Sequence, residues 1–267
     1  MSRPAVAAAV LSASVALALA GGADPCECLN WRSVYSSDRV ACGEGLEFHV
    51  FEGAFGYDLP GIEYIKKEFR AVYDQFCTSF FMKLDSTLCV NLGMYALGTP
   101  GLLAGQWCYV SKECAELNGG QTIPDKAAPK AGSGWFNSPP PSPLPRDVSW
   151  KTCDRNGDKL LRDVPPAELL ELARSMGAAA GYVTKIAYPR LLPPNHTWVT
   201  IGDAVAKGDL EGMPKALRVA IERRVPVVID VDSDGHGHQK IIHGREVYHL
   251  TNTTGWPYSR GKDVGEL

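Results

Sequence analysis

The sequence lacks a strong excess of charge of either sign. Its 27 Lys and Arg residues nearly balance 30 Asp and Glu residues, which gives a formal net charge of −3. Proteins that bind nucleic acid or an anionic membrane surface through electrostatics carry a marked positive patch, because those partners are dense in negative charge. The charge balance argues against both partners, and we expect no nucleic-acid binding.

Long apolar runs are also missing after the N-terminal region. No later segment approaches the 18 or more apolar residues that a membrane-spanning helix needs. Residues 5–20 are apolar, follow Arg3 and end in Ala18-Leu19-Ala20, the small-residue pattern of a cleavage site. We therefore expect a signal peptide at residues 1–20 and a secreted mature chain without a membrane span. The alternative is an anchor, for which this Ala-rich stretch is short.

Tandem CxxC pairs, which a zinc knuckle needs, are absent, and the closest pair is Cys26-x-Cys28. An even number of cysteines in an exported chain indicates a disulfide framework, although eight cysteines allow 105 pairings. Seven of the eight fall between residues 26 and 114, and seven is odd. If all pair, Cys153 must bridge back to this first region. The predicted disulfide cysteines are Cys26, Cys28, Cys42, Cys77, Cys89, Cys108, Cys114 and Cys153.

Two N-glycosylation sequons fit an exported chain. They are Asn195-His196-Thr197 and Asn252-Thr253-Thr254. We expect glycans on Asn195 and Asn252.

A Pro-, Gly- and Ser-rich stretch divides the mature chain in two. Residues 119–149 lack apolar periodicity and include Pro139-Pro140-Pro141, which favours a locally stiff linker. The division predicts a small cysteine-rich module at 21–118 and a second module at 150–267.

One long helix is expected in the first module, at residues 61–84. Apolar side chains recur there at steps of three and four residues, which places them on one helical face with Cys77 beside it. Residues 48–57 and 105–114 are expected to form short strands and disulfide-tied loops. The predicted buried face comprises Ile65, Phe69, Val72, Tyr73, Phe76 and Phe80.

The second module alternates helix and strand signals. Asp163 as a cap and two following prolines predict a helix that ends before Gly177. A second helix is expected at 213–224. Strands are expected at 225–229, 239–243 and 246–252, the last two joined by a turn at Gly244-Arg245. The fold class is therefore α+β, with an antiparallel sheet at the end of the second module.

Three aspartates and four of the six histidines crowd into residues 227–250. The Asp-x-Asp-x-Asp-Gly run at 230–235 resembles the start of an EF-hand loop, in which alternate oxygens wrap Ca²⁺. The twelfth position, however, is Ile241 and not a glutamate, and the expected flanks are strands. A weaker resemblance to the same Ca²⁺-binding loop occurs at 154–158, where Lys159 stands in place of the turn glycine. Turns rich in Asp, Asn and Gly are common for conformational reasons alone.

The histidines offer a second metal hypothesis. The turn at Gly244-Arg245 would pair Lys240 with His249 and bring His238 diagonally beside it. Imidazoles and carboxylates together suit Zn²⁺. We expect a solvent loop without a cofactor, and keep Ca²⁺ or Zn²⁺ binding as an alternative. Its ligands would come from Asp230, Asp232, Asp234, His236, His238 and His249.

The segments PVVIDV, GHGHQKIIHG and VYHLTNTTGW, preceded by a helix, resemble the C-terminal half of papain-like cysteine peptidases. The resemblance implies that His238 is the base and that Asn252 orients its ring. Family members also carry a glutamine followed by a Cys-Gly-Ser-Cys-Trp-like segment, and this chain has no such run. Cys108, with Gln106 before it, is the nearest candidate nucleophile. A cysteine peptidase or an inactive relative is therefore an alternative function.

The six tryptophans and ten tyrosines could stack on sugars or fill the core. The motifs LNWRSVY, FCTSF, GQWCYVSKEC and WKTC, with LLRDVPPAELLELA after them, resemble a set of cysteine-rich secreted proteins of dinoflagellate algae. That resemblance implies export and a shared disulfide plan. We expect a secreted, disulfide-stabilised, non-enzymatic protein that binds an extracellular carbohydrate or protein, or has a structural role outside the cell.

Overall fold

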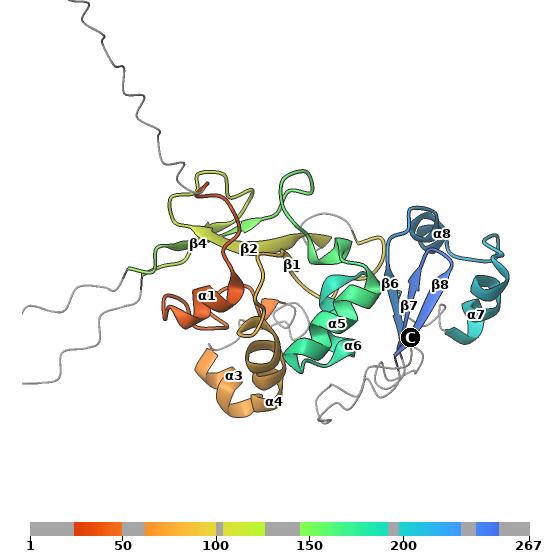
Figure 1. Ribbon diagram of the computed structural model, residues 1–267, viewed down its shortest axis with the longest axis horizontal. Helices are drawn as coiled ribbons and strands as arrows, with labels where there is room; N and C mark the ends of the chain where they lie inside the picture. The colour runs from red at the N-terminus through yellow and green to blue at the C-terminus, as the bar shows by residue number, and fades with distance from the viewer. Residues whose placement is uncertain are drawn as a thin grey trace, which may run out of the picture.

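The computed structural model describes residues 24–49, 62–99, 104–125, 145–191, 198–230 and 239–250 (Figure 1). The helices and two four-stranded sheets of these residues confirm the α+β class. The expected signal peptide and both sequons, at Asn195 and Asn252, lie outside the described residues.

The first sheet has the strand order β1-β2-β4-β3, and every neighbouring pair is antiparallel. Its centre is formed by β2 (Gln106–Ser111) and β4 (Val148–Thr152), which pair over five residues, from Trp107 opposite Thr152 to Ser111 opposite Val148. The outer strands β1 (Val90–Asn91) and β3 (Gln121–Thr122) pair over only two residues each.

Both ends of the expected linker take part in this sheet. Strand β3 and the first two residues of β4 lie within 119–149, and the rest of β4 lies in the expected second module. Residues 126–144 fall outside the described part of the chain. The division into two modules stays a prediction, and the sheet draws strands from both sides of it.

The expected helix at 61–84 is divided into three segments. They are α3 (Ile62–Glu68), α4 (Arg70–Tyr73) and the π-helix η1 (Asp74–Phe81). The division falls at Phe69, whose φ of −125° and ψ of 45° are not helical, and this residue is 42% exposed. The expectation that Phe69 faces the core is therefore wrong, because the break and the wider π-turn reset the helical register.

The other apolar positions of this region behave largely as expected. Ile65, Val72, Phe76 and Phe80 are buried, and Tyr73 is half-buried. Around them lies an aromatic core in which Trp31 of α1 (Trp31–Ser36) has its ring 4.9 Å from that of Trp107, centroid to centroid, in an edge-to-face arrangement. Such pairs stabilise a core beyond simple area burial.

Two helices lie between the two sheets (Figure 1). The first, α5 (Pro166–Met176), begins after Pro165 and ends at Gly177, whose φ of 66° is the left-handed conformation that closes many helices. The expected cap Asp163 instead ends a short 3₁₀ turn, η3 (Leu161–Asp163). The second, α6 (Ala180–Ala187), was not predicted, and it is buried along its whole length.

The second sheet has the order β5-β6-β7-β8. Strand β5 (Arg190–Leu191) is parallel to β6 (Val227–Asp230), whereas β7 (Gln239–His243) and β8 (Glu246–Leu250) continue the sheet in antiparallel fashion. The expected hairpin is confirmed: Gly244 turns with a φ of 62°, and Lys240 lies opposite His249.

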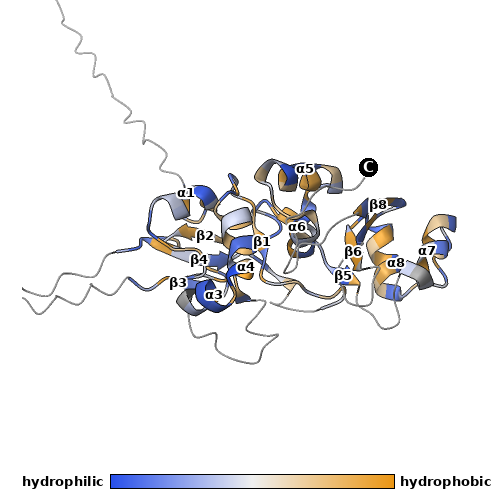
Figure 2. Ribbon diagram, turned by 90° about the horizontal axis from the view of Figure 1, so that it is seen from below, coloured by the Kyte–Doolittle hydropathy of each residue, from blue (hydrophilic) through white to orange (hydrophobic). Residues whose placement is uncertain are grey.

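Both faces of the second sheet are covered. Helices α5 and α6 lie on one side, and α7 (Trp198–Lys207) and α8 (Lys215–Glu222) on the other (Figure 1). Strand β6 is hydrophobic, and α8 turns Leu217, Ala220 and Ile221 into the core (Figure 2). Because side chains alternate along a strand, Val228 joins the main core while Val227 and Ile229 join a second core with α7 and α8.

Candidate functional site

All eight cysteines lie in the described residues, and all of them pair. The expected disulfide framework is therefore confirmed, including the bridge from Cys153 back to the first region. The four disulfides are Cys26–Cys114, Cys28–Cys108, Cys42–Cys77 and Cys89–Cys153.

The segment before α1 explains two of these pairs. It runs beside β2, where the Leu29 amide donates to the Tyr109 carbonyl at 2.7 Å and the Ser111 amide donates to the Pro25 carbonyl at 3.1 Å. This pairing brings Cys28 to Cys108 within the strand and Cys26 to Cys114 just after it. Sequence spacing carries no sign of this contact across about 80 residues.

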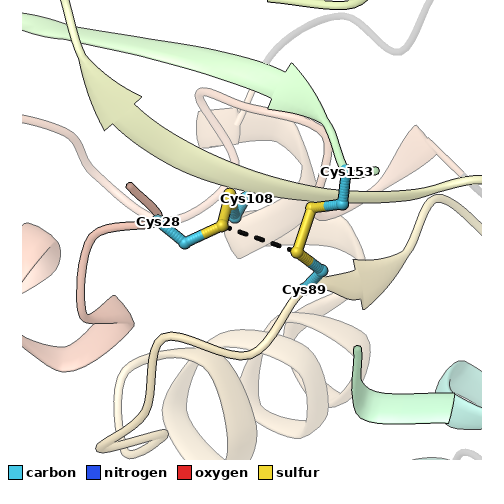
Figure 3. Close-up of side chains that lie close together, drawn as sticks. All are labelled: Cys28, Cys89, Cys108 and Cys153. Atoms are coloured by element: carbon cyan, nitrogen blue, oxygen red, sulfur yellow. Dashed lines mark hydrogen bonds between the residues drawn. A yellow bond between two sulfur atoms is a disulfide. The ribbon is translucent and has the colours of Figure 1, made fainter. Parts of the chain in front are cut away.

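Two of the disulfides touch. Cys28 Sγ lies 3.5 Å from Cys89 Sγ, and the sulfur atoms of Cys28, Cys89, Cys108 and Cys153 all lie within 4.8 Å of one another (Figure 3). We call these residues the four-sulfur cluster. Three of its members are buried, and Cys153 is half-buried.

A buried ion pair borders the cluster. Lys151 Nζ donates to Asp158 Oδ1 at 2.8 Å, and this oxygen lies 3.8 Å from Cys28 Sγ. Asp158 Oδ2 accepts from the Asp154 amide, and Asp154 Oδ1 accepts from the Asn156 amide. The segment 154–158, which resembles a Ca²⁺-binding loop, is thus a turn whose carboxylates accept hydrogen bonds from its own backbone and from a lysine. Asp-rich turns commonly bond to their own backbone in this way.

A buried carboxylate contacts two tyrosines of the aromatic core. Glu47 Oε1 accepts from the hydroxyls of Tyr35 at 2.7 Å and Tyr109 at 2.6 Å, and Oε2 accepts from the Gly45 amide at 3.0 Å. Burial raises the pKa of Glu47, and the hydrogen bonds from both tyrosines oppose this. Sequence reasoning missed Glu47, because an isolated glutamate in a loop carries no signal of burial.

Cys108, the candidate nucleophile of the peptidase hypothesis, has no free thiol. Cys108 Sγ is bonded to Cys28, and only a thiolate attacks as a nucleophile. Gln106 is buried, and its Nε2 donates to Asn91 Oδ1 at 2.7 Å. The other two candidates, His238 and Asn252, lie outside the described residues.

Of the predicted metal ligands, only His249 has a described side chain. Asp230 ends β6, where its backbone pairs with Gln239. The remaining candidates, Asp232, Asp234, His236 and His238, lie outside the described residues.

His249 belongs to a cluster at the outer edge of the second sheet. Its Nδ1 accepts from Lys240 Nζ at 2.5 Å, and the same Nζ lies 4.8 Å from the ring centre of Trp198. The indole lies close over Gly202, where a Cβ would come within 2.8 Å of it. We call Trp198, Lys240 and His249 the Trp-Lys-His surface.

Both titratable groups of this surface have lowered pKa values. Burial lowers the pKa of Lys240. Burial, and then the Lys240 charge, lower the pKa of His249, which favours its neutral form as the acceptor. A negative charge nearby would raise both pKa values, because it favours the charged form of each group.

Comparison with protein-family models, with curated proteins and with solved structures finds no match to the chain. Within the described ranges, every helix is too short or too polar to cross a bilayer. The four disulfides fit a protein of the secretory pathway or the extracellular space, where oxidising conditions preserve such bonds.

Proposed function

We propose that the chain is a secreted, non-enzymatic binding protein that holds an acidic extracellular carbohydrate on the Trp-Lys-His surface. The observation that carries this proposal is the position of Lys240 Nζ, which contacts both the Trp198 ring and His249. The disulfides support the extracellular part of the proposal, because crosslinks stabilise small modules exposed outside the cell.

An acidic sugar suits this surface chemically. Its carboxylate would take hydrogen bonds from Lys240 and from protonated His249, and charge-assisted bonds of this kind are stronger than neutral ones. The Trp198 ring would hold Lys240 Nζ in position through their cation–π contact at 4.8 Å. A neutral sugar would leave the lysine ammonium without a new partner.

The coupling between anion binding and the protonation of His249 supplies a specific test. Binding an anion favours the protonated form of His249, whose pKa is lowered in the free protein. By linkage, affinity should rise as the pH falls through the pKa of His249, down to the pH at which the sugar carboxylate itself becomes protonated.

The experiment is calorimetric titration of the mature chain with galacturonic acid oligomers, against neutral galactose oligomers. We expect Lys240→Gln and Trp198→Ala each to weaken binding at least about tenfold, which corresponds to about 1.4 kcal/mol. Lys207→Gln is the matched control, because Lys207 is an exposed lysine at the last residue of α7, the helix that begins with Trp198. Equal binding of acidic and neutral oligomers, or equal effects of the Lys207 and Lys240 variants, would refute the proposal.

A further inference from the structure

The four-sulfur cluster is assembled from four separate parts of the chain. Cys28 precedes α1, Cys89 immediately precedes β1, Cys108 lies within β2 and Cys153 immediately follows β4 (Figure 3). Backbone pairing fixes all four: Leu29 bonds Tyr109, the Cys89 amide bonds the Lys159 carbonyl, and the Cys153 amide bonds the Gln106 carbonyl. The sulfur positions are therefore set by the sheet as well as by the S–S bonds.

The four sulfurs lie close enough together to form a tetrahedral thiolate site once the bonded pairs, Cys28–Cys108 and Cys89–Cys153, have separated on reduction. Zn²⁺ binds cysteine sulfur at about 2.3 Å, which places the four sulfurs of a tetrahedron about 3.8 Å apart. The four-sulfur cluster already holds every sulfur within 4.8 Å of the others, with Cys28 and Cys89 at 3.5 Å across the two disulfides. Small rotations of side chains would then suffice to surround an ion.

The surroundings also suit a thiolate complex. Four thiolates around a divalent ion carry a net charge of −2. The charged neighbours are Asp158, whose Oδ1 lies 3.8 Å from Cys28 Sγ, and Lys151, whose Nζ pairs with that oxygen at 2.8 Å and so offsets its charge. Burial of the sulfurs excludes competing water ligands, which favours a closed, four-coordinate site. Among the described residues this is the one group of cysteine, histidine or acidic side chains with a metal-binding arrangement.

We propose that the four-sulfur cluster, once its two disulfides are reduced, binds one soft divalent cation of the Zn²⁺ class. Two equivalents of a phosphine supply four electrons: each S–S bond breaks, each phosphine takes the oxygen of one water to become a phosphine oxide, and the four protons of the two waters complete four thiols. The ion then displaces those four protons to give a tetrathiolate. The same residues thus have an oxidised form with two crosslinks and a reduced form with one metal ion.

Two variants with equal numbers of cysteine test this. The first keeps the cluster and replaces Cys26, Cys114, Cys42 and Cys77 by Ser. The second keeps those four and replaces Cys28, Cys89, Cys108 and Cys153 by Ser. Each is reduced with a phosphine without oxygen and titrated with Co²⁺ and then Zn²⁺, with the visible absorption of cobalt as the readout.

We expect the first variant to bind one Co²⁺ with the spectrum of a tetrahedral thiolate complex, at least about 100-fold more tightly than the second. Equal affinities would overturn the proposal, because binding would then reflect only the number of thiols.

The wild-type chain gives an independent readout that does not depend on how the variants fold. After reduction and addition of one equivalent of Zn²⁺, alkylation with iodoacetamide is mapped by mass spectrometry. We expect protection of the four cluster cysteines and labelling of Cys26, Cys42, Cys77 and Cys114. Protection spread evenly over all eight, or none, would refute the site.

Discussion

Removal of the Cys89–Cys153 crosslink should destabilise the chain strongly. The bond closes a loop of 64 residues, and a crosslink across a loop of this length stabilises a fold by about 4 kcal/mol through the entropy of the unfolded chain. The other three disulfides do not appreciably shorten the path between these residues. Cys89→Ala/Cys153→Ala should therefore lose about 4 kcal/mol, which for a chain of this size lowers Tm by about 8–16 °C.

The assay is urea unfolding of the non-reduced proteins, followed by tryptophan fluorescence, with a thermal scan beside it. The fully reduced wild type and fully reduced variant form the control pair, and their fluorescence should agree at every urea concentration because neither holds the crosslink. A loss below about 1 kcal/mol in the non-reduced variant would show that the crosslink does not restrain the unfolded chain as the loop model requires.

Two further predictions concern Glu47 and Gly177. Because burial raises the pKa of Glu47, the stability that this carboxyl contributes is complete below its unfolded value of 4.5 and declines as the pH rises towards the folded value. Glu47→Gln should therefore flatten the pH dependence of the urea midpoint above pH 4.5. A slope unchanged by the substitution would contradict this. Gly177→Ala should cost about 1 kcal/mol in urea unfolding, since alanine is strained at a φ of 66°. Gly157→Ala, in open space within a turn, is its control, and an equal loss in both variants would count against the argument.

The C-terminal elements could be predicted because their signals are local. Pro214 before α8, the β-branched run of β6 and the glycine turn at Gly244 each specify structure within a few residues. The register of the hairpin followed from the turn alone, and it correctly paired Lys240 with His249. The bridge from Cys153 to the first region also followed from the sequence alone, because that region holds an odd number of cysteines.

Features set by distant contacts could not be predicted. The helix breaks at Phe69, and no propensity in the sequence marks this position. The buried Glu47 is stabilised by tyrosines 12 and 62 residues away. Likewise, β4 follows a proline-rich stretch that indicates a boundary, yet its partner β2 lies before that stretch.

Two of the disulfides reinforce the first sheet, whose outer strands are very short. Strands β1 and β3 pair through two residues each, and so short a ladder supplies few hydrogen bonds to hold its register. Cys89 lies at the start of β1 and is tied to Cys153 at the end of β4, while Cys28 ties the segment before α1 to β2. The second sheet contains no cysteine and is instead held by apolar side chains on both faces. A metal ion in the reduced four-sulfur cluster would join the same four segments, so either form of the cluster supplies the restraint that the short strands lack.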